Sequence, residues 1–349
     1  MGVHQPTMES MAIKRILVTG SEGYIGAVLV PLLCRVGYAV CGLDTCFYGI
    51  SGNSGYTLVR KDIRDITKKD IAGIDAVIHL AALSNDPMGD LDEKLTEDIN
   101  FRSSVNLARL AKASGVSRFL FSSSCSIYGK KDKDLVDESS PVVPLTAYAK
   151  SKIRTEQELQ KLAEKNFTVG ILRNSTVYGF SPMFRSDLVV NNFVIDALMR
   201  SEIRIKSDGT PWRPLIDVRD LSSVFLEFLT APKEAINGRI TNIGFVENNL
   251  QVRDVLDTVK NVLPRCNVIY TGEHGKDTRS YRVDFGRLTK LFPQVRQEWP
   301  LQKSIADMVS HLTRLLRRDT SLRDEQFVRL KMLTMLRSVG TLDANLRWC

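Results

Sequence analysis

A glycine-rich turn stands between an apolar run and a helical pattern near the start of the chain. Residues 15–19 read Arg-Ile-Leu-Val-Thr, which is typical of a buried strand, and Gly20, Gly23 and Gly26 follow closely. Glycines permit a tight turn and a close approach of the backbone to a bound group. The helical pattern over residues 25–36 adds unpaired N–H groups and the positive end of a helix dipole. Strand, turn and helix together predict a site for the pyrophosphate of a dinucleotide.

The same alternation of strands and helices continues through the first half of the chain. Strand patterns cover residues 38–43, 57–60, 76–80, 118–122 and 168–172, and helical patterns cover residues 95–114 and about 148–165. Such alternation predicts parallel strands joined by right-handed crossovers. We therefore expect an α/β fold with a doubly wound parallel sheet of the Rossmann type. The rhythm becomes less regular after Gly179, which favours a smaller C-terminal substrate-binding lobe.

Four parts are expected along the chain. They are a disordered leader (residues 1–13), a dinucleotide-binding domain (14–180), a substrate-binding lobe with segments that return to the main domain (181–310), and a basic helical tail (311–349). The tail holds eight Lys or Arg and four Asp or Glu, so it carries +4 of the net charge of +8. The chain contains no nucleic-acid-binding motif, so we interpret the basic tail as a solvated helical surface.

Composition excludes several classes of protein. The chain is 43% hydrophobic and 25% charged, which is ordinary for a globular protein. No run approaches the ~18 consecutive apolar residues of a membrane helix, and residues 1–14 lack the apolar core of a secretory signal. The six cysteines form no Cys-x-x-Cys pair and have no histidine cluster beside them. We therefore expect no metal site and a reduced, cytoplasmic protein.

Two carboxylates are candidates for contacts with the adenosine half of the dinucleotide. Asp44 ends the second strand pattern, 18 residues after Gly26. A carboxylate there accepts hydrogen bonds from the ribose hydroxyls and repels a 2′-phosphate, which favours NAD over NADP. Asp62 is a candidate partner for the adenine amino group, or alternatively an acid in a solvated loop.

Tyr148 and Lys152 are four residues apart in a helical pattern, so both side chains lie on one face of the helix. A nearby ammonium group favours the phenolate and lowers the pKa of a tyrosine. A phenol of that kind can exchange a proton with a substrate hydroxyl while a hydride moves elsewhere. The pair predicts hydride chemistry on a nicotinamide cofactor.

Further motifs make the chain resemble the extended short-chain dehydrogenase/reductases, and among them the nucleotide-sugar epimerases and dehydratases. The resemblance covers about residues 14 to 310. It rests on the glycine turn, His79-Leu80-Ala81-Ala82, Asn100, Ser122-Ser123-Ser124, Tyr148-x-x-x-Lys152, Leu172-Arg173, Asp208-Gly209-Thr210 and Asp217-Val218-x-Asp220. It implies NAD as cofactor, a nucleotide-diphosphate sugar as substrate and a homodimer formed through helices that flank the sheet.

The resemblance also implies roles for individual residues. Ser124, Tyr148 and Lys152 are the expected catalytic residues, and Cys125 is either a further acid/base or a small buried residue. Expected cofactor contacts are Gly20, Gly23, Tyr24, Ile25, Gly26, Asp44, Asp62, Ile63, Leu80, Ala81, Ala82, Asn100, Tyr148 and Lys152. Expected substrate contacts are Ser84, Ser124, Thr176, Asn192, Arg213 and Arg279, although Ser84 alternatively belongs to a turn.

The chain departs from the family pattern at two places. Thr176 stands where many sugar epimerases carry an asparagine, so the particular sugar cannot be inferred. Cys125-Ser126 stands where the 4,6-dehydratases carry an Asp-Glu pair that serves as acid and base. We therefore expect an epimerase that acts through a transient keto-sugar. The alternatives are a nucleotide-sugar dehydrogenase or ketoreductase, an atypical dehydratase and, in another class, a non-catalytic sensor of nicotinamide redox state.

Overall fold

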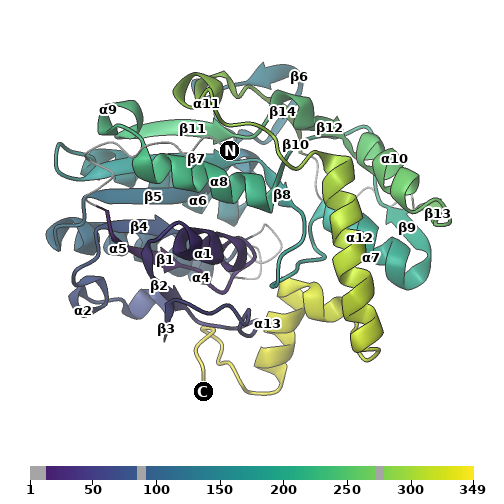
Figure 1. Cartoon of the computed structure of the whole chain (residues 1–349), viewed down its shortest axis with the longest axis horizontal. Helices are drawn as coiled ribbons and strands as arrows, with labels where there is room; N and C mark the ends of the chain where they lie inside the picture. Colours follow the sequence, from purple (N-terminus) through teal and green to yellow (C-terminus); the bar gives the residue numbers. More distant parts are fainter. Residues whose placement is uncertain (1–12, 85–91, 272–278) are drawn as a thin grey trace. The chain divides into compact units, whose positions relative to one another are not determined.

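A computed structural model describes residues 13–84, 92–271 and 279–349 (Figure 1). The chain forms two compact units. The described residues of unit 1 fall within Met1–Ser124, Pro144–Arg173 and Ser222–Thr241, and those of unit 2 within Cys125–Val143, Asn174–Leu221 and Asn242–Cys349. Nearly all of the predicted leader lies outside the described residues.

A seven-stranded sheet forms the centre of unit 1. In the order of the sheet, its strands are β11 (Arg239–Ile243), β7 (Thr168–Asn174), β5 (Arg118–Ser124), β4 (Ala76–His79), β1 (Arg15–Thr19), β2 (Ala39–Asp44) and β3 (Thr57–Arg60). The pairs β1–β2, β2–β3, β1–β4 and β4–β5 are parallel. The strand order reverses between β1 and β4, which is the switch point of a doubly wound sheet. The predicted fold class is confirmed.

The strands next to the switch point are apolar because both of their faces are covered. Ile16, Leu17 and Val18 of β1 are fully buried, as are Val77 and Ile78 of β4. Helices on both faces are the usual cover for such strands. The helices in or extending into unit 1 are α1 (Gly26–Arg35), α2 (Lys68–Ile71), α4 (Glu93–Thr96), α5 (Ser103–Ala113), α6 (Ala147–Leu162), α8 (Val218–Thr230) and α9 (Lys233–Ile236), with the 3-10 turn η2 (Ile63–Asp65).

The helix predicted over residues 95–114 has three parts. A six-residue π-helix, η3 (Glu97–Arg102), separates α4 from α5. Asn100 lies within it and is buried. π segments are rare and frequently occur at functional sites. The π-helix therefore indicates that the loop after β4, which Asn100 contacts, belongs to a functional site.

Unit 2 has smaller sheets and a helical core. The sheets pair β8 (Thr176–Tyr178), β10 (Trp212–Asp217) and β12 (Asn249–Gln251), then β9 (Glu202–Ile205) with β13 (Asn267–Tyr270), and β6 (Lys130–Val136) with β14 (Ser280–Val283). The helices are α7 (Val189–Arg200), α10 (Val252–Val262), α11 (Gly286–Leu291), α12 (Leu301–Arg318) and α13 (Arg329–Ser338), with the 3-10 turns η4 (Cys125–Tyr128), η5 (Val246–Asn248) and η6 (Asp324–Phe327).

The C-terminal tail contributes to the core of unit 2. Leu312 of α12 is fully buried there together with residues of α7 and α10, and Phe327 packs against the same cluster. The ring of Phe327 meets Phe184 edge to face at 5.6 Å, and Arg329 donates to the Met183 carbonyl at 2.8 Å. The apolar stripe of the tail is therefore internal to this unit. No described helix is long and apolar enough to cross a membrane.

Candidate active site

Two glycines of the turn lie too close to backbone atoms to carry a side chain. Gly20 has a φ of +74°, and a Cβ atom there would lie 2.8 Å from the backbone nitrogen of Ala81. A Cβ atom at Gly26 would lie 2.2 Å from the carbonyl oxygen of Gly20. Helix α1 begins at Gly26, so the positive end of its dipole lies at this turn. The turn therefore fits a pyrophosphate, which needs bare backbone and a helix N-terminus.

The loop after β4 lies beside this turn. The N–H of Leu80 donates to the Thr19 carbonyl at 3.0 Å, and Ala81 donates to the Thr19 hydroxyl at 3.4 Å. The buried amide of Asn100 holds the next part of the loop through two bonds to the backbone of Leu83, at 2.8 and 3.0 Å. The side chain of Asn100 thus positions the loop that carries the predicted cofactor contacts.

Asp44 is held at the end of β2 by two backbone N–H groups. Its carboxylate accepts from Glu22 at 3.0 Å and from Cys46 at 2.7 Å. The bond to Glu22 connects the carboxylate to the glycine turn, where the predicted contact with the adenosine ribose requires it. Asp62 instead binds the side chain of Arg64, with a shortest N–O separation of 2.6 Å. Its predicted bond to adenine would therefore compete with that ion pair.

The predicted catalytic pair lies at the carboxyl end of β5. Tyr148 is in the first turn of α6, where Thr146 caps the helix by accepting from the Ala149 N–H at 3.1 Å. The Nζ atom of Lys152 lies 5.5 Å from the centroid of the Tyr148 ring. It also donates to the Ser122 carbonyl at 2.8 Å. Because Ser124 ends the same strand, the structure brings the elements that carry all three residues together.

Burial lowers the pKa of Lys152 to about 8, while the charge of Glu156 acts in the opposite direction. Glu156 lies one turn further along α6 and forms a buried ion pair with Arg173 at 2.7 Å. The Ser123 hydroxyl donates to the same carboxylate. A lysine with this pKa is still mostly protonated at neutral pH, so it can supply the cation that a tyrosine acid/base needs.

The predicted substrate contacts of unit 2 lie on different elements. Thr176 of β8 pairs with Leu215 of β10, and Arg213 lies near the start of the latter strand. The Arg213 guanidinium donates to the Arg279 carbonyl, so the two predicted arginines are neighbours. Asn192 is half-buried on α7. Within the described part of the chain, its side-chain amide makes no hydrogen bond.

Comparison with known proteins identifies the family. The model of the "NAD dependent epimerase/dehydratase family" matches residues 16–244, which is well over half of the chain. The chain belongs to this family. It is therefore an NAD-dependent enzyme, and the glycine turn of unit 1, with Asp44 beside it, provides features that fit the cofactor.

Relatives in the family include both epimerases and dehydratases. The mouse dTDP-D-glucose 4,6-dehydratase is 29% identical over 246 residues, which cover 66% of this chain and 68% of that protein. The UDP-glucuronate 4-epimerase of Thermodesulfobacterium geofontis is 24% identical over 310 residues, covering 83% and 94%. The solved UDP-glucose 4-epimerase of Thermotoga maritima is 23% identical with a TM-score of 0.78, covering 86% and 99%, a likeness that shows the fold.

In this member of the epimerase/dehydratase family, the residue after Ser124 is buried. Cys125 is 1% exposed and begins the turn η4, where Ser126 is also buried. Burial of this kind is common for a cysteine that packs as a small apolar residue. A chemical role for Cys125 stays a prediction.

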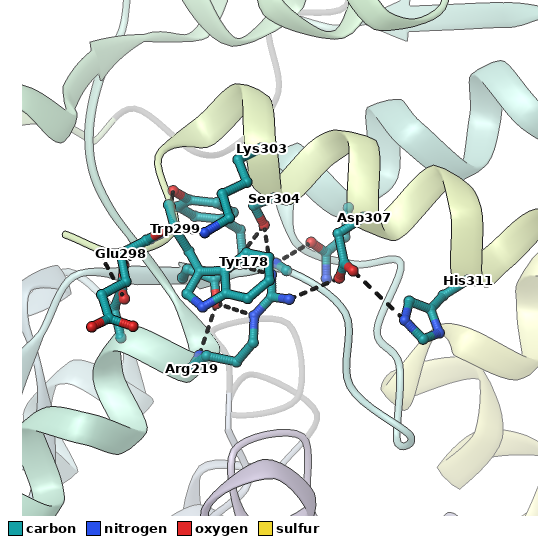
Figure 2. Close-up of polar contacts among 12 residues, drawn as sticks. Tyr178, Arg219, Glu298, Trp299, Lys303, Ser304, Asp307 and His311 are labelled. Carbon is teal, nitrogen blue, oxygen red and sulfur yellow. Dashed lines mark hydrogen bonds and ion pairs between the residues drawn. The ribbon is translucent and has the colours of Figure 1, made fainter. Parts of the chain in front are cut away.

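A polar network in unit 2 was only partly foreseen from the sequence (Figure 2). Asp217 is fully buried and accepts from Arg219, with one N–O distance of 2.8 Å, and from the Ser304 hydroxyl. Arg219 also forms an ion pair with Asp307 of α12 at 2.8 Å. Its guanidinium carbon lies 3.2 Å from the centroid of the Trp299 ring. The network therefore joins α12 to the end of β10.

The neighbouring Asp220 of the same motif accepts backbone N–H bonds from Glu298 at 3.2 Å and Trp299 at 3.1 Å. Burial raises its pKa to about 7. Asp217 and Asp220 thus both fix the segment that leads into α12. The sequence motif signals these acids, but their partners other than Arg219 lie 78 to 87 residues away along the chain.

His79 belongs to one of the sequence motifs, but no role was predicted for its buried side chain. His79 ends β4 with both ring nitrogens engaged, at 2.6 Å from the Thr19 hydroxyl and 2.7 Å from the Ser104 hydroxyl. Burial and the charge of Lys152 lower its pKa to about 3, so the ring is neutral. His79 thus connects the last residue of β1 to α5. Over the described ranges, no group of three or more His, Cys, Asp or Glu side chains could hold a metal ion.

Proposed function

We propose that the chain is an epimerase that acts on a nucleotide-diphosphate sugar through a transient keto-sugar. The observation that carries the proposal is the Tyr148–Lys152 pair at the end of β5, in a chain without carboxylates directly after Ser124. This arrangement supplies what oxidation of a ring hydroxyl requires. It lacks the acid and base with which a 4,6-dehydratase eliminates water.

Each residue of the pair has a distinct part in proton transfer. The Tyr148 phenolate takes the proton of a sugar hydroxyl and returns it when the ketone is reduced. The Lys152 ammonium stabilises that phenolate, as does the N-terminal end of α6, whose dipole favours negative charge there. Ser124 donates its hydroxyl hydrogen to the oxygen that becomes the ketone. Bound NAD supplies the hydride acceptor for the oxidation and the hydride donor for the reduction.

The diphosphate is the expected ligand of unit 2. Arg213 and Arg279 would pair with its oxygens, because a guanidinium group matches the fork of two phosphate oxygens. The side-chain amide of Asn192 would donate to the same group. The similar proteins from mouse, Thermodesulfobacterium geofontis and Thermotoga maritima carry names that specify dTDP- or UDP-linked sugars, which supports a nucleotide sugar of this class.

The experiment that tests the proposal is a substrate panel. Purified protein is incubated with NAD and with UDP-, GDP-, CDP- and dTDP-sugars, while chromatography follows epimers and absorbance at the reduced-cofactor band follows net redox change. An epimer without accumulation of reduced cofactor supports the proposal. Accumulation of reduced cofactor would identify a dehydrogenase, and loss of water from the sugar would identify an atypical dehydratase.

A Tyr148→Phe variant is the control for catalysis. It keeps the ring and loses the proton-transfer group, so turnover is expected to fall by about 10²-fold or more. Tyr270→Phe removes a hydroxyl from an exposed tyrosine and should leave turnover unchanged. If neither the wild type nor Tyr148→Phe turns over any of the sugars while both still bind NAD, the redox-sensor alternative is favoured.

We also propose a cytoplasmic homodimer. The six cysteines are free thiols, which is consistent with a reducing compartment. The outward faces of α5 and α6 carry Arg109 and Arg154, which pair with Glu158 and Glu97. A dimer through these helices would therefore have a polar, salt-sensitive interface. Light scattering at micromolar concentration tests it, and a monomer at low salt would contradict it.

A further inference from the structure

A buried carboxylate lies inside the glycine turn. Glu22 stands between Gly20 and Gly23 and is only 2% exposed. Its carboxylate accepts hydrogen bonds from the Tyr56 hydroxyl and from the Ser51 N–H. An anionic side chain is unexpected in a turn that binds an anionic pyrophosphate, because like charges repel. Burying it also requires partners, which Tyr56 and Ser51 supply.

These partners belong to the loop between β2 and β3, residues 45–56. The loop is also fixed to α1, because the side-chain amide of Asn53 donates to the Ala27 carbonyl at 2.8 Å. The ring of Tyr56 packs on β2, where a Cβ atom at Gly42 would lie 2.6 Å from its edge. The side chain of Glu22 therefore connects the glycine turn to the loop that follows Asp44.

The backbone of Glu22 acts on Asp44 directly. Its N–H donates to one carboxylate oxygen of Asp44, and the first part of the loop supplies the donor to the other, the N–H of Cys46. Cys46 has a φ of +56°, a strained conformation for a residue with a side chain. One residue thus holds both the loop and the carboxylate predicted to bind the adenosine ribose.

Asp44, Glu22 and Arg60 all place charge near the thiol of Cys46. The Cys46 thiol is buried beside them, and its pKa rises to about 11 through burial and the charges of Asp44 and Glu22, against the effect of Arg60. Arg60 pairs in register with Asp44 across β2 and β3. An arginine next to the ribose-binding carboxylate is a feature that would attract a 2′-phosphate. The carboxylate of Glu22 adds a second negative charge to that of Asp44, so the net charge of these three side chains stays negative.

We propose that Glu22 is a positioning and selectivity residue of the cofactor site. Its carboxylate holds the β2–β3 loop so that Asp44 is preset for the ribose hydroxyls. Its charge offsets Arg60 and thereby adds to the rejection of NADP. The proposal goes beyond the proposed epimerase activity and does not depend on the sugar, because it concerns the binding of the dinucleotide alone.

Two variants separate the two parts of the proposal. Glu22→Gln keeps an acceptor for Tyr56 and Ser51 and removes the charge, whereas Tyr56→Phe keeps the charge and removes one contact to the loop. Glu234→Gln on α9, where the side chain is 73% exposed, changes the net charge equally and is the matched control. Titration calorimetry gives the affinities for NAD+ and NADP+, and hydrogen exchange reports on residues 45–56.

For Glu22→Gln we expect the ratio of NAD+ to NADP+ affinity to fall by about fivefold or more at low salt, an effect that added salt should reduce. For Tyr56→Phe we expect faster exchange in residues 45–56 and a similar loss of affinity for both dinucleotides. If the ratio of the two affinities is unchanged in Glu22→Gln, even where both affinities fall, the selectivity role is overturned. Unchanged exchange in Tyr56→Phe would overturn the positioning role. Thermal unfolding verifies that each variant is folded, and Tyr56→Phe keeps the positioning role testable if Glu22→Gln does not fold.

Discussion

The Nζ atom of Lys152 donates to the carbonyl oxygen of Ser122 at 2.8 Å. This bond joins helix α6 to the last part of strand β5, two residues before Ser124. It orients the lysine along the face of the helix that carries Tyr148, and it accounts for one of the three ammonium hydrogens. We propose that the remaining donors and the charge serve the phenol and a cofactor ribose.

The first prediction concerns alkaline pH. Because burial lowers the pKa of Lys152 to about 8, the cation is present below that pH and is lost as the pH rises through it. We expect kcat/KM to decline above about pH 8, since the Tyr148 phenolate loses its partner. Lys152→Arg stays charged and should move the decline to higher pH, whereas Lys152→Met should lower the rate by about 10²-fold across the range. A wild-type profile that stays flat to pH 10 would contradict this assignment.

The sheet could be predicted from the sequence because its central strands are buried on both faces. Runs such as Ile16-Leu17-Val18 have no polar alternation and are separated by helical patterns, so each strand is visible by itself. Strands β6, β8, β9, β12 and β14 were not predicted. They are short or polar, and pairing with distant segments defines them, as when Ser280 of β14 pairs with Lys130 of β6.

The approach of Lys152 to Tyr148 could be predicted in a similar way. Tyr148 and Lys152 are four residues apart, and helical geometry alone brings them together. The partners of buried groups are not visible in this way. His79 bonds to Thr19 and Ser104, and Glu22 bonds to Tyr56, across sequence separations that no local pattern encodes. Glu22 even contradicts the local expectation, because a charged residue in a turn is ordinarily solvated.

The second prediction concerns the buried ion pair of Glu156 and Arg173. Glu156→Gln leaves the buried guanidinium without its counter-charge and should lower the free energy of unfolding by about 3–5 kcal/mol. Replacing both residues, as Glu156→Leu with Arg173→Met, should recover much of that loss. Chemical denaturation measures both variants. Glu158→Gln, which removes a surface partner of Arg109, should leave the midpoint nearly unchanged.

The same variant should also alter the pH profile. The charge of Glu156 raises the pKa of Lys152 against the larger effect of burial. In Glu156→Gln the pKa of Lys152 should fall further, so the alkaline decline of kcat/KM should begin at a lower pH than in the wild type. A purely structural ion pair would reduce stability and leave the position of the decline unchanged.

The third prediction concerns acid stability. The imidazole of His79 has a pKa near 3 in the folded protein and about 6.5 when unfolded. As the pH falls below 6.5, the unfolded state takes up a proton that the folded state does not, so stability is lost progressively toward pH 3. Each pH unit in this window should cost about 1.4 kcal/mol for this one group.

Replacing the histidine tests this contribution. His79→Gln should be less stable than the wild type at pH 7.5, because an amide cannot hydrogen-bond to both the Thr19 and the Ser104 hydroxyl in the geometry of the imidazole. Between pH 6.5 and 4.5, however, its unfolding free energy should fall less steeply than that of the wild type. His311→Gln, at a half-exposed site, should keep the wild-type slope. Equal slopes in His79→Gln and the wild type would show that His79 is protonated in the fold.

The last prediction concerns the glycine turn. A Cβ atom at Gly26 would lie 2.2 Å from the Gly20 carbonyl and 2.6 Å from that of Ser21, and backbone atoms cannot move aside without opening the turn. At Gly23 the nearest atom would be 3.1 Å away, and φ is not positive there. Gly26→Ala should therefore abolish measurable NAD+ binding and lower the melting temperature, whereas Gly23→Ala should bind with moderately reduced affinity. Calorimetry and thermal unfolding distinguish the two, and an undiminished NAD+ affinity in Gly26→Ala would mean that the turn does not hold the cofactor.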